Sequence, residues 1–348
     1  MIDIRHHNAR SLREHLPRLE RYVAREPQMP LSRHPAWLTV LQKGLGHVPH
    51  CLEAVEDGQT CGLLPLAYVG SWLFGRFLVG LPYLNYGGVV ADNDRVAQKL
   101  VENAATLADG LKVRYLELRH EQPLACDKLG GQRSDKVNMR LALPATGEEL
   151  WKRLASKVRN QIRNGQKNGL TVAWGGQDLL AEFYKVFRRN MRDLGTPVYS
   201  KKLFQSILEQ FRDRAELCVV RAEGTPVAAA LLLHGWGVTE VPSASSLRLY
   251  NHTCANMLMY WHLLERSIQR GQAVFDFGRA SQDSNTYRFK KQWGAQPAVA
   301  GWQYYLRVGT EADMRADNPK YERLVRLWRW LPVSLTSWIG PLIVRGIP

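Results

Sequence analysis

One β-hairpin pattern occurs twice in the chain, and this repeat limits the possible folds more than any other feature of the sequence. The segments CLEAVEDGQTCGLLPLAYV, which begins at Cys51, and CVVRAEGTPVAAALLLHGW, which begins at Cys218, each contain a β-rich run, an acidic–Gly turn and a second β-rich run. This pattern predicts an antiparallel hairpin in each place. Because short hairpins are common and the identities are few, chance similarity is the alternative explanation.

A helix-then-strand pattern also occurs twice, after each predicted hairpin. VENAATLADGLKVRYLELRH begins at Val101 and LLERSIQRGQAVFDFGRAS begins at Leu263. Each predicts a helix, a glycine that can cap its C-terminus, and a strand with an acid near its end, Glu117 or Asp276. The two copies lie about 160–167 positions apart, which indicates a duplicated α/β domain.

The length of 348 residues also favours two domains over one. The stretch ALPATGEE (142–149) is the expected junction, because Pro144 and Gly147 interrupt regular structure and Thr146 can cap a helix that starts near Gly147. The expected division is a first domain over 1–145, a second over 146–310 and a short tail over 311–348.

The formal net charge of +15 and the pI of about 9.7 indicate a polyanionic partner, such as a phosphorylated ligand, nucleic acid or an anionic membrane. The alternative is a merely basic soluble protein.

The five scattered cysteines form no CxxC pair, which is typical of reduced thiols in the cytoplasm, and no metal site is expected. The sequence also lacks the glycine-rich nucleotide motifs, the GxSxG nucleophile motif and the HExxH zinc motif.

A strongly cationic helix is predicted over 150–167. Leu150, Leu154, Val158 and Ile162 recur at a spacing of four and therefore share one face. The other faces carry cations without one intervening acid, which favours contact with an anionic ligand, although a solvated face is the alternative. These cations are Lys152, Arg153, Lys157, Arg159, Arg163 and Lys167, of which Lys157, Arg159 and Arg163 are expected to bind substrate.

A strand followed by a long helix is predicted over 240–271. A helix N-terminus offers unpaired N–H groups and can hold a phosphate. We therefore expect Ser245, Ser246 and Asn256 to bind the phosphate of a co-substrate. The compatible alternative is that Asn251 or Thr253 simply caps the helix.

The stretch FDFGRASQDSNTYRFKKQWGA (275–295) leaves a strand and gathers cations and aromatic residues. Because ligands of open α/β sheets often sit at strand ends, this loop is expected to bind substrate. Its cations can neutralise phosphate and its aromatic rings can stack on a ring or a sugar. The expected binding residues are Arg279, Ser281, Tyr287, Lys290, Lys291 and Trp293.

The segments NMRDLGTPVYS, ASSLRLYN, NMLMYW, FDFGRASQDSNTYRFKKQWGAQP and LPYLNYGGVVADN resemble a known family. The chain is similar, over roughly 30–345, to the FemAB-related proteins associated with PEP-CTERM/exosortase systems, in the FemAB-like branch of the GNAT acyltransferase superfamily. The resemblance implies an α/β (α+β) fold with tandem GNAT-like domains and mixed sheets, followed by a short helical tail.

The same resemblance implies an N-acyltransferase that acts on a cell-envelope or exopolysaccharide intermediate. The acyl donor would be acyl-CoA or aminoacyl-tRNA, with no tightly bound cofactor, and the acceptor a phosphorylated or lipid-linked saccharide. DNA is not expected as a partner, and tRNA is expected only as part of the donor. Candidates for the base are Asp276, Asp283 and His252, although Asp276 could equally pair with Arg279 as a structural carboxylate.

A non-enzymatic scaffold that binds a polyanion or a membrane is the alternative function. An enzyme should have a cleft between Arg279, Lys290 and the strand before Cys254, whereas a binding protein should have a flat basic surface.

The last residues, Tyr321–Pro348, predict a peripheral contact with the inner membrane. Leu324, Leu327, Trp328 and Leu331 share one helical face beside several arginines, a pattern typical of an interfacial helix. The alternative is that this tail packs across the two domains as core.

Overall fold

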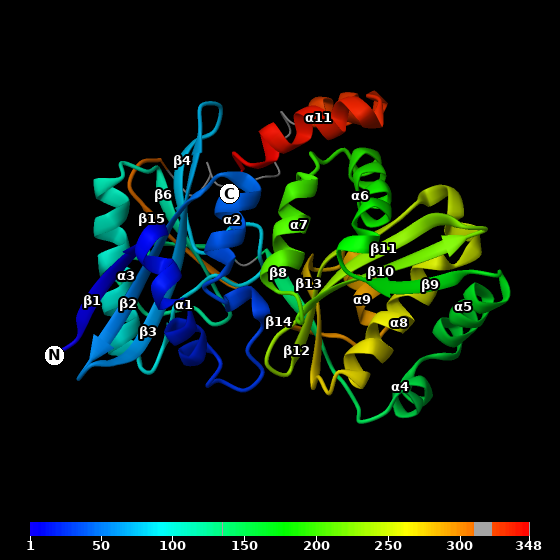
Figure 1. The fold of residues 1–348 in the computed structure, drawn as a ribbon, viewed down its shortest axis with the longest axis horizontal. Helices are drawn as coiled ribbons and strands as arrows, with labels where there is room; N and C mark the ends of the chain where they lie inside the picture. Colours follow the sequence, from blue (N-terminus) through cyan, green and yellow to red (C-terminus); the bar gives the residue numbers. More distant parts are fainter. Residues whose placement is uncertain (134, 310–321, 348) are drawn as a thin grey trace.

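The protein is built around two β-sheets that stand side by side, as Figure 1 shows in this computed structural model. The structure describes residues 1–133, 135–309 and 322–347. The expected tail over 311–348 therefore lies partly outside the described residues.

The first sheet contains eight strands among the described residues. They pair in the order β1-β2-β3-β4-β6-β15-β7, with β5 attached to β3. Their bounds are β1 (Asp3–Asn8), β2 (Val48–Glu56), β3 (Gln59–Ser71), β4 (Gly75–Val79), β5 (Val90–Ala91), β6 (Tyr115–His120), β7 (Gly131–Arg133) and β15 (Gly301–Leu306). The accompanying helices are α1 (Ala9–Val23), α2 (Trp37–Leu45) and α3 (Asp94–Gly110).

The second sheet contains seven strands in the described part of the chain, in the order β14-β8-β13-β12-β11-β10-β9. Their bounds are β8 (Lys136–Ala142), β9 (Thr171–Gly175), β10 (Ala215–Ala222), β11 (Thr225–His234), β12 (Val238–Ser246), β13 (Val274–Ser281) and β14 (Gln296–Val299). Its helices are α4 (Gly147–Arg153), α5 (Ser156–Lys167), α6 (Leu180–Leu194), α7 (Lys201–Gln210), α8 (Ala255–Gln269) and α9 (Asn285–Lys291).

Both predicted hairpins are present. β2 pairs with β3, and β10 pairs with β11, in antiparallel fashion. Their turns have the same backbone conformation. Asp57 and Gly58 have positive φ angles of 50° and 78°, and Glu223 and Gly224 have positive φ angles of 49° and 76°. Two consecutive positive φ values match the twist of a tight hairpin, which explains the acidic–Gly pair in each copy.

The predicted helix-then-strand pattern is also present in both halves. After α3, β6 runs parallel to β4, and after α8, β13 runs parallel to β12. The glycine after α8 acts as expected, because Gly271 adopts a φ of +69°. After α3 the left-handed residue is Lys112, with a φ of 52°, rather than the expected Gly110.

The two sheets exchange strands across the expected boundaries. β8 precedes residue 145 but belongs to the second sheet, where it pairs with β13. β15 precedes residue 310 but belongs to the first sheet, where it pairs with β6. The division into domains at residues 145 and 310 stays a proposal. Each sheet contains one strand from the other side of the proposed boundary, β8 in the second sheet and β15 in the first.

The predicted helix over 150–167 is two helices. α4 ends at Arg153 and α5 begins at Ser156, since Leu154 and Ala155 are extended, with ψ angles of 140° and 148°. The predicted cap is present, because the Thr146 hydroxyl accepts a hydrogen bond from the backbone N–H of Glu149 at 3.2 Å. The apolar stripe survives the break, and its four members are all buried: Leu150, Leu154, Val158 and Ile162.

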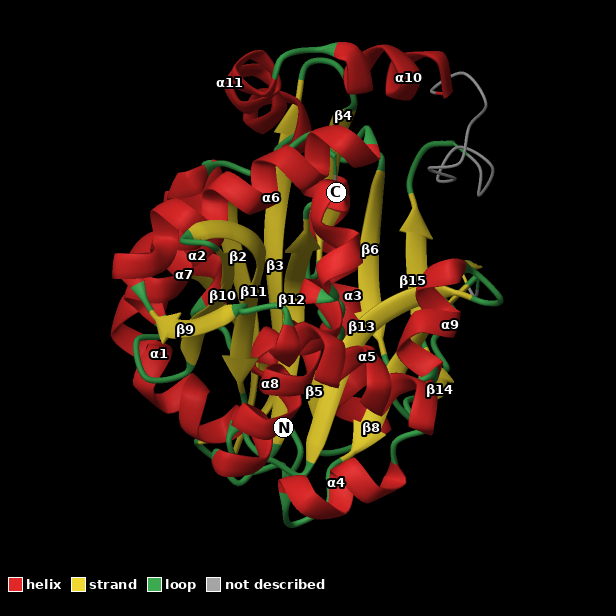
Figure 2. Cartoon of the chain, turned by 90° about the vertical axis from the view of Figure 1, so that its right-hand side faces the viewer, coloured by secondary structure: helices red, strands yellow, loops and turns green. Residues whose placement is uncertain are grey.

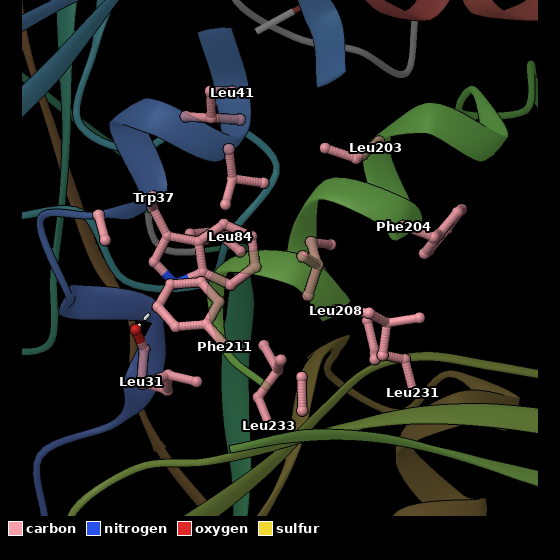
Figure 3. Close-up of a cluster of buried hydrophobic side chains, with 14 of the residues drawn as sticks. Leu31, Trp37, Leu41, Leu84, Leu203, Phe204, Leu208, Phe211, Leu231 and Leu233 are labelled. Carbon is pink, nitrogen blue, oxygen red and sulfur yellow. Dashed lines mark hydrogen bonds between the residues drawn. The ribbon is translucent and has the colours of Figure 1, made fainter. Parts of the chain in front are cut away.

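A shared hydrophobic core joins the two sheets. On β11, Leu231 and Leu233 face this core, whereas Leu232 faces a second core against α8, as the alternation of a strand requires. Figure 3 shows α2 opposite α7 within the shared core. There the rings of Trp37 and Phe211 lie 5.1 Å apart. Close packing of this kind fixes the relative position of the two sheets.

Two further helices, α10 (Glu322–Trp330) and α11 (Val333–Val344), lie beyond one end of the sheets, near the tip of the β3–β4 hairpin (Figure 2). Within the part of the chain that the structure describes, no helix combines the length and the apolar character needed to cross a bilayer.

Candidate active site

A cavity opens where β12 and β13 move apart. The two strands pair in parallel only over Val238–Glu240 and Val274–Asp276. Just beyond the last pair, the register of β12 against β11 shifts, and so does the register of β13 against β8. Gly278 supplies a positive φ of 74° at the bulge in β13. Because bulges bend and twist strands, two of them at the same level separate β12 from β13.

The cavity has a volume of about 430 Å³ and a mostly polar wall. Three cations, one carboxylate, one amide and several hydroxyl groups face it, so it suits a polar, anionic ligand better than an apolar one. The lining residues are Tyr83, Leu84, Asn85, Lys136, Leu233, Glu240, Val241, Pro242, Phe277, Gly278, Arg279, Ala280, Ser281, Ser284, Thr286 and Lys290.

Lys290 is a buried cation at the cavity wall. It lies on α9, and only 6% of its surface is exposed. Its Nζ donates to the carbonyl oxygens of Gly278 at 3.0 Å and Arg279 at 2.8 Å, which ties α9 to the bulge in β13. Burial lowers the pKa of Lys290 to about 8, an effect that the Asp276 carboxylate opposes and the Arg279 guanidinium reinforces.

Arg279 connects the cavity to the first half of the chain. Its Nε donates to Oδ1 of Asn85 at 3.2 Å, and its guanidinium lies 3.7 Å from the ring centre of Trp302. Asn85 belongs to the segment between β4 and β5, and Trp302 to β15. The site is therefore assembled from both halves of the chain.

Asp276 is fully buried beneath the cavity and does not line it. Its carboxylate accepts from the backbone N–H of Gly278 at 2.7 Å, from Nε of Arg140 at 3.1 Å and from the hydroxyl of Tyr86. Its ion pair is with Arg140, whereas the sequence analysis expected Arg279 as the alternative partner. These contacts give Asp276 a clear positioning role at the bulge.

Glu240 is a candidate base that was not expected from the sequence. It lies next to Asp276 across the β12–β13 pair, lines the cavity, and is only 3% exposed. Ser32 donates to its two oxygens, from the backbone N–H at 2.9 Å and from Oγ at 2.6 Å. Burial and the nearby Asp276 charge raise the pKa of Glu240 to about 7. A carboxyl group with a pKa near neutrality is well suited to proton transfer.

The sequence contained a signal for this residue, because Glu240 opens the stretch EVPSASS. An acid inside an otherwise uncharged strand is unusual unless it has partners. The residues expected to bind phosphate, Ser245 and Ser246, follow Glu240 on the same strand.

The aromatic residues expected to stack on substrate belong to the hydrophobic core. Trp293 is 1% exposed and Tyr287 is 8% exposed, and both pack in the core beneath α9. Lys291 is exposed outside the cavity lining, as is Asp283, which occupies a left-handed turn position with a φ of 60°. The cavity thus brings together Arg279, Ser281 and Lys290 of the predicted set.

The residues expected around the start of α8 form a separate group. α8 begins after Cys254, whose φ is +59°, and no side chain caps it. The predicted caps Asn251 and Thr253 are therefore absent, since the Thr253 hydroxyl donates to the carbonyl of Tyr250 at 2.7 Å.

Ser245 is buried and accepts from the side-chain amide of Asn190 at 3.1 Å. Ser246 and Asn256 are half-buried, and His252 is exposed, with Nδ1 donating to the carbonyl of Leu249 at 3.1 Å. None of these four lines the 430 Å³ cavity.

The cationic helix α5 packs on α8. Its Gly165 lies against the carbonyl of Cys254 and the side chain of Leu258, at the start of α8. Lys157 and Arg163 are exposed, Arg159 is half-buried, and none of the three lines the cavity. They therefore belong to the surface around α8.

The comparisons with known proteins agree with this architecture. Residues 152–291 match the family described as the acetyltransferase (GNAT) domain, and this segment includes β9 to β13, α5 to α9 and most of the residues that line the cavity. No curated protein matches the sequence.

Solved structures show the same fold over nearly the whole chain. The crystal structure of FemX is similar at 15% identity and a TM-score of 0.67, covering 88% of this chain and 97% of that one. A tandem GNAT protein from the clavulanic acid biosynthesis pathway gives 10% identity and 0.57, covering 89% and 100%. L-PGS from Bacillus licheniformis gives 13% identity and 0.55, covering 90% and 96%. The expected fold, tandem GNAT-like units with mixed sheets and a short helical tail, is therefore confirmed.

Proposed function

We propose that the protein is an N-acyltransferase that moves an acyl or aminoacyl group onto an amine of a cell-envelope or exopolysaccharide intermediate. The observation that carries the proposal is the polar cavity between β12 and β13, where Glu240 and Lys290 both line the wall. The match of residues 152–291 to the GNAT acetyltransferase domain supports the same reaction class.

The chemistry of the wall suits acyl transfer. The acceptor nitrogen forms a bond to the carbonyl carbon of the donor, and the bond from that carbon to the leaving sulfur or oxygen breaks. Glu240 takes the proton that the amine loses, which its pKa of about 7 allows near neutral pH. Lys290, held by two carbonyl groups, supplies positive charge for the developing oxyanion.

The donor is proposed to be acyl-CoA or aminoacyl-tRNA. Both carry phosphates, and two features near the start of α8 favour phosphate. The first turn of α8 has no side-chain cap, and α5 brings the exposed cations Lys157 and Arg163 to the same side of the sheet. Ser246 and Asn256 would then contact the donor.

The acceptor is proposed to be a phosphorylated or lipid-linked saccharide that bears an amine. Arg279, Lys136 and Lys290 give the cavity an excess of positive charge over the single Glu240 carboxylate. The hydroxyl groups of Ser281, Ser284 and Thr286 suit a sugar.

A screen of donors and acceptors tests the proposal. Purified protein is incubated with acyl-CoAs or with aminoacyl-tRNAs, together with amino sugars and their phosphates, and products are identified by mass spectrometry. We expect a mass increase equal to one acyl group on the amine. No transfer from any donor, by a protein shown to be folded, would contradict it.

The scaffold alternative has less support. It predicted a flat basic surface, whereas Arg279 and Lys290 line a cavity together with Glu240–Pro242 of the strand before Cys254. A cavity with a buried carboxyl group of raised pKa is expected of an enzyme rather than a binding surface.

A further inference from the structure

The helix α11 leaves several of its large apolar side chains exposed. Its inner stripe consists of the small or medium residues Thr336, Gly340 and Val344, which are buried at a spacing of four. Its outer stripe contains Trp338, which is 72% exposed, and Leu342, which is 60% exposed. A surface helix of a globular protein normally has the reverse arrangement, so α11 points to an apolar surrounding on its outer side.

The inner side of the tail is already fixed to the body of the protein. A side chain at Gly340 would meet the backbone of Val198 at 2.9 Å, so the helix sits very close. The Arg192 guanidinium donates to the carbonyl oxygens of Arg329 at 3.2 Å and Leu331 at 3.3 Å. The tail therefore holds its position while Trp338 and Leu342 stay exposed. Its other large apolar residues, Trp328, Leu331, Ile339 and Ile343, are half-buried.

A second element extends the apolar surface. The β3–β4 turn carries Trp72, which is 96% exposed, and Leu73, which is 57% exposed. A side chain at Gly346, just after α11, would contact Ser71 and Phe74 of this turn. Figures 1 and 2 place the tip of the β3–β4 hairpin and α11 at the same end of the molecule. We call Trp72, Leu73, Trp330, Leu335, Trp338 and Leu342 the tail surface.

The charge of the tail helices indicates which kind of partner fits the tail surface. From the start of α10 to the C-terminus the sequence contains arginines at 323, 326, 329 and 345 and a single acid, Glu322. A second copy of the chain docked on the same surface would bring these cations together, which opposes self-association. An anionic lipid surface instead attracts them, and tryptophan is favoured at the depth of the lipid headgroups.

The tail surface is connected to the cavity through Tyr83. Its hydroxyl donates to the carbonyl oxygen of Arg345 at 3.1 Å, and its side chain also lines the cavity. We propose that the tail surface lies in the headgroup region of an anionic bilayer and holds the cavity close to that bilayer, so that a lipid-linked acceptor is reached there. The identity of the acceptor rests on the proposed function, whereas the membrane contact does not.

Vesicle flotation tests the membrane contact directly. The full chain is mixed with vesicles of phosphatidylcholine alone or of phosphatidylcholine with phosphatidylglycerol, and floated through a density gradient. We expect flotation with the anionic vesicles. The triple variant Trp72→Ser, Trp338→Ser, Leu342→Ser should lower the partition coefficient about tenfold or more, because it removes three large apolar side chains from the interface.

A charge-reversal variant tests the ionic contribution, and a second variant on another part of the surface serves as a control. Arg326→Glu should weaken flotation with anionic vesicles about threefold or more and have no effect with neutral ones. Val299→Ser, on the distant strand β14, removes an apolar side chain of 50% exposure and should leave flotation unchanged. Circular dichroism confirms that each variant is folded.

The outcomes distinguish the membrane contact from the proposed function. If the folded wild type stays in the soluble fraction with both vesicles, or if it forms a dimer in sedimentation that the triple variant abolishes, the membrane proposal is overturned. If it floats as expected but the donor and acceptor screen shows no transfer, the membrane contact stands and the proposed function fails. A triple variant that transfers to soluble amino sugars at the wild-type rate but fails on vesicle-bound acceptor supports both.

Discussion

The two halves of the protein contain the same kind of parallel strand pair, β4 with β6 and β12 with β13, but the two pairs differ beyond their last paired residues. In the first half, β4 and β6 pair over Leu78–Val79 and Leu116–Glu117. In the second half, β12 and β13 pair over three residues and then separate around the 430 Å³ cavity. The repeated sequence pattern therefore forms two strand pairs of different geometry.

A segment of the chain itself closes the opening in the first half. After β4, Gly80 donates to the carbonyl of Glu117 at 2.8 Å, and Gly87 donates to the carbonyl of Arg119 at 3.1 Å. The two glycines touch, since a side chain at Gly87 would lie 1.8 Å from the carbonyl oxygen of Gly80. Between them, Tyr83, Leu84 and Asn85 reach across and line the cavity of the second half. We call the β4–β6 pair of the first half the closed copy and the β12–β13 pair of the second half the open copy. The closed copy therefore provides one wall of the cavity at the open copy.

The acidic residues beside the two strand pairs are similar on one strand and different on the other. Glu117 and Asp276 occupy equivalent positions, and each is buried with an arginine partner, Arg119 and Arg140 respectively. On the neighbouring strand, however, the first half has Val79 where the second half has Glu240. A second carboxyl group beside the first is what raises the pKa of Glu240, after burial itself. The open copy thus has a titratable group that the closed copy lacks.

The largest expected effect comes from Glu240→Gln, which removes the proposed base from the open copy. The rate of transfer should fall by about 10²–10⁴-fold, while folding is retained. In the wild type the rate should rise with pH up to about 7, because Glu240 must lose its proton to act as a base. The variant should lose this dependence, and Glu14→Gln on the exposed side of α1 should keep it. An unchanged pH profile in Glu240→Gln would assign the base elsewhere.

Lys290→Ala and Arg279→Ala should each lower turnover by about one to two decades, since each removes a charge-assisted contact at the cavity. The wild-type rate should also fall above about pH 8, as Lys290 loses its proton, and Lys290→Ala should not show this decline. Steady-state kinetics across pH measures both. Wild-type kinetics in the two variants would remove this loop from the site.

The closed copy should respond through stability. Gly87→Ala places a methyl group against the backbone of Gly80, so the free energy of unfolding should fall by about 1–3 kcal/mol. The control is Gly110→Ala at the end of α3, where a side chain meets nothing within 4 Å. If denaturant unfolding finds the two variants equally stable, the segment after β4 does not pack as closely as the contact between Gly80 and Gly87 indicates.

The smallest effect is expected on the surface of α5. The double variant Lys157→Glu, Arg163→Glu should weaken donor binding several-fold, and more strongly at low salt, because exposed charges are screened. Lys43→Glu, on α2 in the other half, is the matched control. Equal donor affinities at every salt concentration would show that α5 has only a solvated cationic face.

Local patterns in the sequence predicted the repeat well, because hairpins and their turns are local. The acidic–Gly turns and the cap at Thr146 depend on residues only a few positions apart, and all are present. The break between α4 and α5 was missed, because Leu150 to Ile162 kept their spacing of four across two extended residues.

The site was predicted only in part, because its walls come from distant residues. The hydrogen bond from Arg279 to Asn85 joins both halves of the chain, and the Lys290 side chain reaches back from α9 to the carbonyl groups at the bulge in β13. No local pattern encodes these contacts. Trp293 was assigned to the ligand, yet it packs in the core. A tryptophan suits either environment, so its residue type alone could not decide.

Hydrogen–deuterium exchange of the full chain tests the contrast between the two openings most directly. The protein is measured alone, with acetyl-CoA and with aminoacylated tRNA. We predict that at least one donor protects β12 and the segment 277–290 and leaves β4 and β6 unchanged. Protection at β4 and β6 without protection at β12, or no protection by either donor, would contradict the assignment of the open copy as the site of acyl transfer.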